Sequence, residues 1–206
     1  MRQVGVARRS LPVVAALALA ASVSAQPVET LRVPAGGRLP HASVGDDGTV
    51  HLVYVVGNGP VGDLMYVTRA AGQGEWSTAQ RVNNVPGTVT GIGPVDGAQL
   101  ALGPDGRLHV AWMRIAPPAF FYARSNEVGS GFEEQFSMAS GDGIEVGPAI
   151  AVDTANNVYL FWHAGGGEDA TRAVYMAVSR DGGSLFEFVR PINAELEGAC
   201  ACCGVA

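Results

Sequence analysis

Eight residues, Ser179-Arg180-Asp181-Gly182-Gly183-Ser184-Leu185-Phe186, decide the fold of this chain. They read Ser-x-Asp-x-Gly-x-x-aromatic and follow a strand-like run, Ala173 to Val178. An aspartate can bond nearby backbone, and glycine accepts positive φ without steric cost, so the stretch suits a tight hairpin. We expect the aromatic ring to fold back under the turn, so that a side-chain clasp closes the hairpin.

Two weaker copies of this clasp precede it in the chain. One begins at Ser125 and keeps the spacing, with a glutamate in place of the aspartate. The other begins at Thr68, has lost the acid at Ala70, and places its aromatic, Trp76, one residue late. A repeat of roughly 55 residues is typical of a propeller or a similar array. The residues expected to build the two better clasps are Ser179, Asp181, Gly183 and Phe186, and Ser125, Glu127, Gly129 and Phe132.

This pattern resembles the Asp-box, or BNR repeat, of the sialidase (neuraminidase) superfamily of β-propellers. The resemblance covers roughly residues 38–203. It implies an all-β fold of consecutive four-stranded antiparallel blades, six of them when the propeller is complete. The blades are expected at about 38–90, 91–142 and 143–195, with 196–206 beginning a fourth.

Each repeat contains four strand-like segments in the same order. The first ends at a turn dipeptide typical of two-residue hairpins, and the second is apolar on both faces, as a strand between neighbouring blades should be. The turn dipeptides are Asp47-Gly48, Asp105-Gly106 and Asn156-Asn157. The four segments are 40–44, 50–54, 64–68 and 79–82 in the first repeat, 97–102, 108–112, 120–125 and 135–138 in the second, and 147–152, 158–162, 174–179 and 188–192 in the third.

Three blades do not close a ring, because propellers typically have four to eight. Gly198 to Cys203 falls where a fourth blade would begin. We therefore expect a fragment of a longer propeller, the alternative being that two copies pair to complete a ring.

The first 25 residues are expected to be a secretory signal peptide rather than part of the fold. Arginines precede an apolar run from Leu11 to Ala21, and Val23-Ser24-Ala25 suits cleavage. Residues 26–37 would form a short lead, and the protein would be periplasmic or secreted. The net charge of −6 without a basic stripe argues against nucleic-acid binding.

The resemblance also implies site residues at the end of the blades opposite the clasps. Arg38-Leu39-Pro40 stands where the family has an arginine that grips the substrate carboxylate, and His41 lies near the channel. Asp63 would be the acid, and Glu145 would, by loop position, pair with the family's tyrosine nucleophile. The plainer interpretation makes Arg38 a surface cation before an extended dipeptide, and Asp63 a turn former.

The leading functional hypothesis is therefore an exported sialidase-like glycoside hydrolase, incomplete and inactive as written. The alternative is a non-catalytic BNR-repeat propeller that binds glycan or protein over its channel, so the sequence leaves open whether the protein is an enzyme. No cofactor and no metal site is expected, because one clasp carboxylate is too few for calcium. His51 and His109 occupy matching positions, where the third repeat has Tyr159, which indicates packing.

Three cysteines, Cys200, Cys202 and Cys203, form a single cluster. In an oxidising compartment, disulfides to residues outside this sequence are expected. A soft-metal thiolate site and a buried free thiol remain the alternatives.

Overall fold

The computed structural model describes residues 28–91, 97–141, 144–165 and 172–192, with only the backbone of residues 145, 146 and 188. The chain divides into two compact units, Met1–Leu31 and Arg32–Ala206. Residues 28–31 of the first unit are exposed and irregular. The predicted signal peptide and the three cysteines lie outside the described residues.

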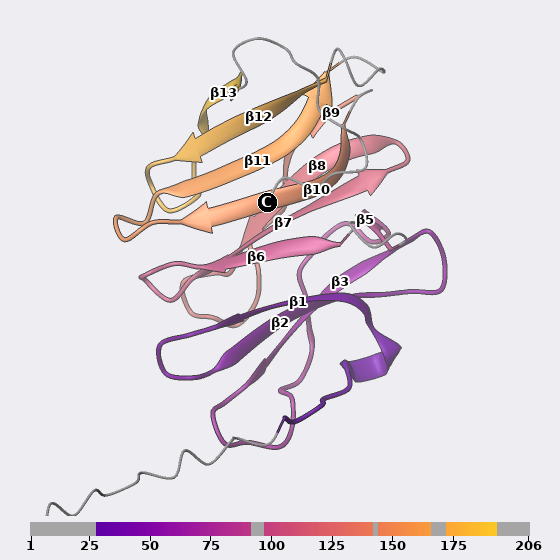
Figure 1. Ribbon diagram of the computed structural model, residues 1–206, viewed down its shortest axis with the longest axis vertical. Helices are drawn as coiled ribbons and strands as arrows, with labels where there is room; N and C mark the ends of the chain where they lie inside the picture. Colours follow the sequence, from indigo (N-terminus) through magenta and orange to yellow (C-terminus); the bar gives the residue numbers. More distant parts are fainter. Residues whose placement is uncertain (1–27, 92–96, 142–143, 166–171, 193–206) are drawn as a thin grey trace, which may run out of the picture. The chain divides into compact units, whose positions relative to one another are not determined.

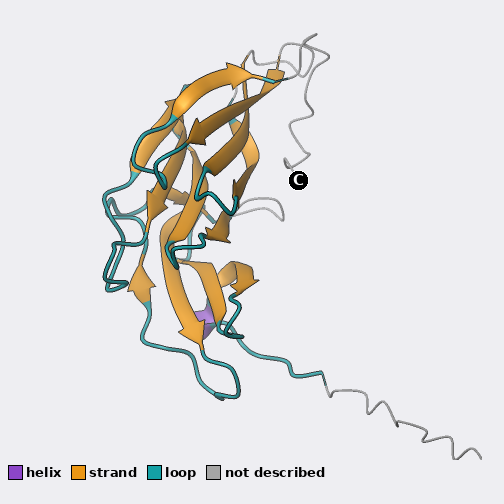
Figure 2. Ribbon diagram, turned by 90° about the vertical axis from the view of Figure 1, so that its left-hand side faces the viewer, coloured by secondary structure: helices purple, strands orange, loops and turns teal. Residues whose placement is uncertain are grey.

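The second unit contains three antiparallel sheets, one for each predicted repeat (Figure 1). We call them blades 1, 2 and 3. Apart from the 3-10 turn η1 (Pro34–Gly36), every regular element of the described residues is a strand (Figure 2). The prediction of an all-β fold of four-stranded antiparallel blades is therefore confirmed.

In each blade the strands are hydrogen-bonded in sequence order. Blade 1 also has an added strand, β5, which pairs with β3 and which the sequence did not predict. Blade 1 comprises β1 (Arg38–Val44), β2 (Val50–Val56), β3 (Val61–Arg69), β4 (Gln80–Arg81) and β5 (Val89–Thr90). Blade 2 comprises β6 (Ala98–Leu102), β7 (Leu108–Ile115), β8 (Pro118–Arg124) and β9 (Phe136–Ser140). Blade 3 comprises β10 (Glu145–Val152), β11 (Val158–Gly165), β12 (Arg172–Ser179) and β13 (Glu187–Pro191).

The turns after the first strands differ from the prediction. Each is a five-residue loop rather than a two-residue hairpin. One backbone hydrogen bond joins the first and last residues of the loop, and another joins the first and fourth residues. The residue that takes positive φ is Gly48, Gly106 or Asn156. The loops are 45–49, 103–107 and 153–157.

Apolar side chains fill the spaces between successive blades. Val53 and Val55 of blade 1 share a buried cluster with Val110 and Trp112 of blade 2. A second cluster joins blades 2 and 3, where the rings of Phe120 and Trp162 stack with centroids 5.0 Å apart. The second strand of each blade is thus apolar on both faces because it faces a partner on each side.

The face of blade 1 that points away from blade 2 is also covered. Leu52, Tyr54 and Val67 are buried there beneath Val33 and Trp76. Trp76 belongs to the degenerate clasp of blade 1. The chain before β1 and this clasp aromatic therefore cap the first sheet.

Candidate functional site

Strand polarity separates two ends of the blades. The loops between first and second strands and the clasps lie at one end, which we call the clasp end. The loops between second and third strands lie at the other, which we call the distal end. The sequence-predicted residues Arg38, Asp63 and Glu145 are all at distal strand ends, since Arg38 pairs with Val55 and Asp63 with Val56.

Arg38 is fixed to the loop between β2 and β3. Its Nη2 donates to the carbonyl oxygens of Gly57 and Gly59, at 2.7 and 3.3 Å. Gly91 follows β5 and approaches so closely that a Cβ there would lie 3.0 Å from the same nitrogen. Within the described residues, Nε and Nη1 of Arg38 make no hydrogen bond. The guanidinium is thus held in place while keeping donors for another group.

Asp63 serves a structural purpose in this arrangement. Its Oδ1 accepts hydrogen bonds from Asn83 Nδ2 and from the backbone nitrogen of Gly87, both at 2.9 Å. Asn83 is fully buried and in turn accepts from the backbone nitrogen of Leu64 at 2.8 Å. The carboxylate therefore anchors the segment between β4 and β5 onto β3.

The other two predicted residues are His41 and Glu145. The Nδ1 of His41 accepts from the backbone nitrogen of Leu100 at 3.3 Å, which ties β1 to β6. Burial lowers the pKa of His41. The structure describes only the backbone of Glu145, which pairs with His163 of β11. Among the described residues, no hydrogen bond or ion pair joins the side chains of Arg38, His41 and Asp63.

A second guanidinium at the distal end, Arg114, belongs to blade 2. It lies 5.3 Å above the ring of Phe121, and its Nε donates to the carbonyl oxygen of Pro117 at 2.9 Å. The next residue, Ile115, donates its backbone N–H to Thr90 Oγ1 at 2.8 Å. Because Thr90 adjoins Gly91, β5 links the surroundings of Arg114 to those of Arg38. This link could not be predicted from the sequence, since Val89–Thr90 is only two residues long.

The clasp of blade 3 is closed by its serine and aspartate. Ser179 Oγ donates to Asp181 Oδ1 at 2.7 Å and accepts from the Gly183 nitrogen at 2.8 Å. Asp181 Oδ1 also accepts from the nitrogens of Ser184 and Leu185, both at 3.0 Å. These bonds, first that from Leu185, lower the pKa of Asp181.

The clasp of blade 2 is closed differently. Asn126 Oδ1 accepts from the Ser130 nitrogen at 3.0 Å, while Glu127 forms no hydrogen bond among the described residues. Ser125 pairs with Phe132 across the turn, and its Oγ accepts from the Leu108 nitrogen at 3.0 Å. The side chain of Asn126, one position before Glu127, therefore closes this turn in place of the glutamate that was expected to do so.

Each of these clasps places its aromatic ring on the preceding blade. Phe132 meets Tyr66 edge-on at 5.6 Å, and Phe186 meets Tyr122 edge-on at 4.8 Å. Both tyrosine hydroxyls lie beside Nδ1 of the matched histidines: His51 at 2.7 Å from Tyr66 and His109 at 2.6 Å from Tyr122. The two histidines are therefore part of the packing between blades.

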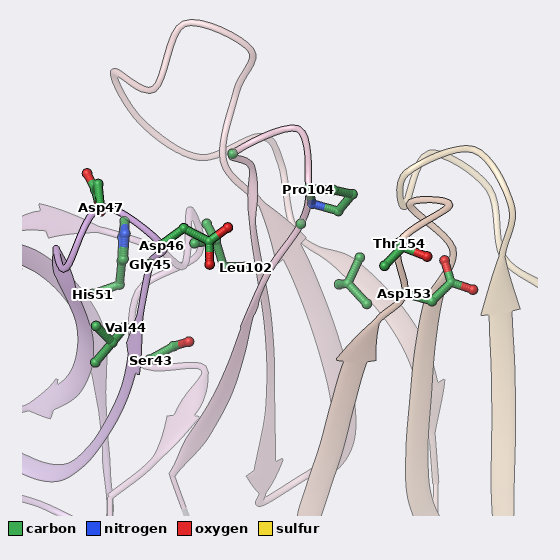
Figure 3. A pocket seen from close by; sticks show the side chains of 13 residues that line it. Ser43, Val44, Gly45, Asp46, Asp47, His51, Leu102, Pro104, Asp153 and Thr154 are labelled. Atoms are coloured by element: carbon green, nitrogen blue, oxygen red, sulfur yellow. The ribbon is translucent and has the colours of Figure 1, made fainter.

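A hollow of about 630 Å³ lies at the clasp end, between the first loops of the three blades (Figure 3). Its lining includes Asp46, Asp47, Leu102 and Asp153. Both oxygens of Asp47 accept from Thr49. Oδ1 of Asp153 accepts from two backbone nitrogens of its own loop, and Oδ2 accepts from the side chains of Asn157 and Tyr159. These two carboxylates hold loops, and the hollow lies opposite the predicted site.

Two further findings concern the described residues only. They contain no group of three or more His, Cys, Asp or Glu side chains able to hold a metal ion. None of their helices has the length and apolar character needed to cross a membrane.

No family model and no curated protein matches this chain. Among solved structures, it is similar to the polysaccharide lyase Uly1 at 17% identity and a TM-score of 0.49, over 72% of this chain and 39% of that one. It is also similar to an endo-arabinase from Bacteroides thetaiotaomicron (14%, 0.43, 75% and 61%) and to a fucose lectin from Kordia zhangzhouensis (13%, 0.41, 72% and 95%). The chain thus spans about two fifths of the lyase. These similarities concern the fold and assign no activity.

Proposed function

We propose that this protein is a non-catalytic propeller that binds a carboxylate-bearing glycan at its distal end. The observation that carries the proposal is the hydrogen bonding of the Arg38 guanidinium. Two loop carbonyls fix one nitrogen of its guanidinium, which leaves Nε and Nη1 as a donor pair. A planar fork of this kind suits the two oxygens of a carboxylate. Arg114, reached through β5, adds positive charge at the same end of the next blade.

The state of Asp63 favours binding over hydrolysis. A general acid must reach the leaving oxygen of the substrate. In this chain, Oδ1 of Asp63 is committed to Asn83 and to the backbone of Gly87. The sialidase-like hydrolase remains the rival proposal, and the same experiment separates the two.

The test is calorimetric titration with N-acetylneuraminic acid and with glucuronic acid, with fucose as a neutral comparison. Arg38→Ala should weaken binding of both acids at least tenfold, because a bidentate charged contact is lost. Asp63→Asn keeps an acceptor oxygen for its two structural bonds and should bind as the wild type does. Equal binding by wild type and Arg38→Ala would remove the proposed site.

The enzyme alternative is tested with a fluorogenic sialoside on the same proteins. The binding proposal predicts release no faster than the blank. Turnover by the wild type that Asp63→Asn abolishes would instead establish the hydrolase and make Asp63 its acid.

We also propose that the protein is exported, on the basis of the leader-like first 25 residues. Fractionation of expressing cells, followed by sequencing of the mature N-terminus, tests this. A start at Gln26 in the exported fraction is expected, and a cytosolic protein that keeps Met1 would contradict it.

A further inference from the structure

His109 is an ionisable side chain buried between blades 2 and 3. The residue is 0% exposed, although its imidazole ring can take up a proton and become charged. Its Nδ1 lies 2.6 Å from the hydroxyl of Tyr122. Its Nε2 is buried and has no hydrogen-bond partner among the described residues. The neutral ring thus fits here, with one nitrogen paired and the other in a dry environment.

Two loops of blade 3 seal this imidazole. Gly183 of the clasp lies against the Tyr122 hydroxyl, and a Cβ there would come within 3.3 Å of His109 Nδ1. The preceding carbonyl, of Gly182, accepts from Arg124 Nη1 at 2.6 Å. On the other side, Asn156 Nδ2 donates to Asp105 Oδ2 at 2.8 Å. The histidine is therefore enclosed by contacts that exist only while blades 2 and 3 are together.

The charges that face the imidazole come from each element packed around it. The two arginines share one carboxylate, because Arg107 and Arg124 both bond to Glu133. The guanidiniums of Arg107 and Arg124 oppose a positive charge on the histidine, whereas the carboxylates of Asp105 and Glu133 favour it, so burial is the main reason that the ring stays neutral. The ionisable groups are Asp105 and Arg107 of the loop before β7, Tyr122 and Arg124 of β8, Glu133 before β9, and Asp181 of the clasp.

We propose that His109 is a proton-sensitive lock: the neutral imidazole holds the clasp of blade 3 on blade 2, and its protonation releases the clasp. Protonation makes both ring nitrogens N–H donors and gives the ring a positive charge. Nδ1 can then no longer accept a hydrogen bond from the Tyr122 hydroxyl, and Nε2, which has no partner among the described residues, carries part of the charge in a dry site. An unpaired charged donor in a dry site is costly, and separation of the blades lets water satisfy it.

The direction of the pH effect follows from the burial of the ring. Burial lowers the pKa of His109 from its ordinary 6.5 to about 4. A released imidazole therefore binds protons over a pH range in which the enclosed one does not. The lock contributes its full stability above pH 6.5 and loses it as the pH falls from 6.5 towards 4.

The chain supplies its own comparison at the interface of blades 1 and 2. His51 and Tyr66 form the same pair at 2.7 Å, with Phe132 on the tyrosine. This histidine is only half-buried, and Gly129 of the facing clasp has nothing within 4 Å of its Cβ position. Water can therefore reach His51 when it is protonated, without separating the blades.

Hydrogen exchange of the whole chain, followed by mass spectrometry between pH 7.5 and 4.5 and corrected for intrinsic rates, tests the lock. Amides of β11, β12 and residues 180–186 should lose at least tenfold protection below pH 6.5, while β2 and β3 keep theirs. His109→Gln, which keeps a partner for Tyr122 but cannot be charged, should abolish this loss. His51→Gln should leave it unchanged.

The proposal is overturned if His109→Gln responds to pH as the wild type does, or if all three blades lose protection together. Should His109→Gln fail to fold, NMR titration of ring-labelled histidine in the wild type decides. Proton uptake by His109 must then accompany the loss of protection, and a ring that stays neutral throughout it contradicts the lock.

Discussion

At the scale of single residues, close contact between the blades depends on a position without a side chain. Gly183 has a φ of +84° and donates its N–H to Ser179 Oγ. A Cβ atom at this position would overlap with the Tyr122 hydroxyl oxygen. Only glycine meets both demands, since other residues are strained at this φ and would displace the tyrosine.

Gly183→Ala should therefore destabilise the protein by roughly 2–4 kcal/mol, the sum of left-handed strain and overpacking. Gly129→Ala is the matched control. It stands at the equivalent clasp position with a φ of +68° and open space around its Cβ, so it should cost only about 1 kcal/mol. Urea unfolding of both variants measures the difference. Equal losses would show that Gly183 does not contact blade 2 as described.

Asp153 determines the acid sensitivity of one loop. Hydrogen bonds from the Asn157 side chain and backbone, and from Tyr159, lower its pKa to about 2. The folded-state pKa lies below the ordinary value of 3.8, so the stabilisation is present above pH 4 and is lost as the pH falls through 2. The slope of thermal stability against pH should thus be shallower in Asp153→Asn between pH 4 and 2. Asp47 and Asp181, whose pKa values are also lowered, would retain part of that slope. An unchanged slope would contradict the assignment.

At the scale of elements, two clasps with similar sequences are closed by different residues. In blade 3 the carboxylate of Asp181 accepts two backbone N–H groups. In blade 2 the equivalent Glu127 is outside the clasp, because Asn126 already binds the Ser130 nitrogen. Sequence spacing alone could not distinguish these cases, since a neighbouring amide competes for the same donors.

The two acids should therefore differ on removal. Asp181→Ala should lower the free energy of unfolding by about 1–2 kcal/mol, because it loses charge-assisted bonds at an exposed turn. Glu127→Ala should change it by less than about 0.5 kcal/mol, as expected for a surface site. Denaturant curves of the two variants provide the check, and an equal loss in both would disprove the separation.

The strands were more predictable than the connections between them. Period, apolar runs and turn residues located twelve of the thirteen strands in the described blades, because each of those signals is local. The predicted two-residue turns were wrong because each loop begins earlier: at Gly45 and Gly103, two positions before the expected dipeptide, and at Asp153, three positions before it. β5 was missed because two residues carry no pattern, and its pairing with Val61 and Gly62 crosses a long connection.

At the scale of the whole described unit, blades 2 and 3 are each attached to the preceding blade by the aromatic residue of their clasp. The aromatic rings contact a tyrosine that lies more than 60 residues earlier in the chain. The sequence predicted the packing role of His51 and His109 from their equivalence. It could not reveal their tyrosine partners or the facing glycines, since those contacts depend on how sheets meet.

For the predicted site, too, the position of the residues was predictable and their bonding partners were not. Strand order correctly implied that Arg38 and Asp63 lie at one end of blade 1. Which atoms they bind could not be predicted, because Asn83 and Gly87 reach Asp63 only through the fold of the segment before β5. The site roles given to Arg38, His41, Asp63 and Glu145 stay predictions.

One measurement tests the arrangement of the blades most directly: nuclear Overhauser contacts between assigned aromatic rings in solution. Cross-peaks are expected between Phe132 and Tyr66 and between Phe186 and Tyr122, whose ring centroids lie 5.6 and 4.8 Å apart. Assigned rings without these cross-peaks, or with each clasp aromatic contacting only its own sheet, would contradict blades that are joined in sequence by their clasps.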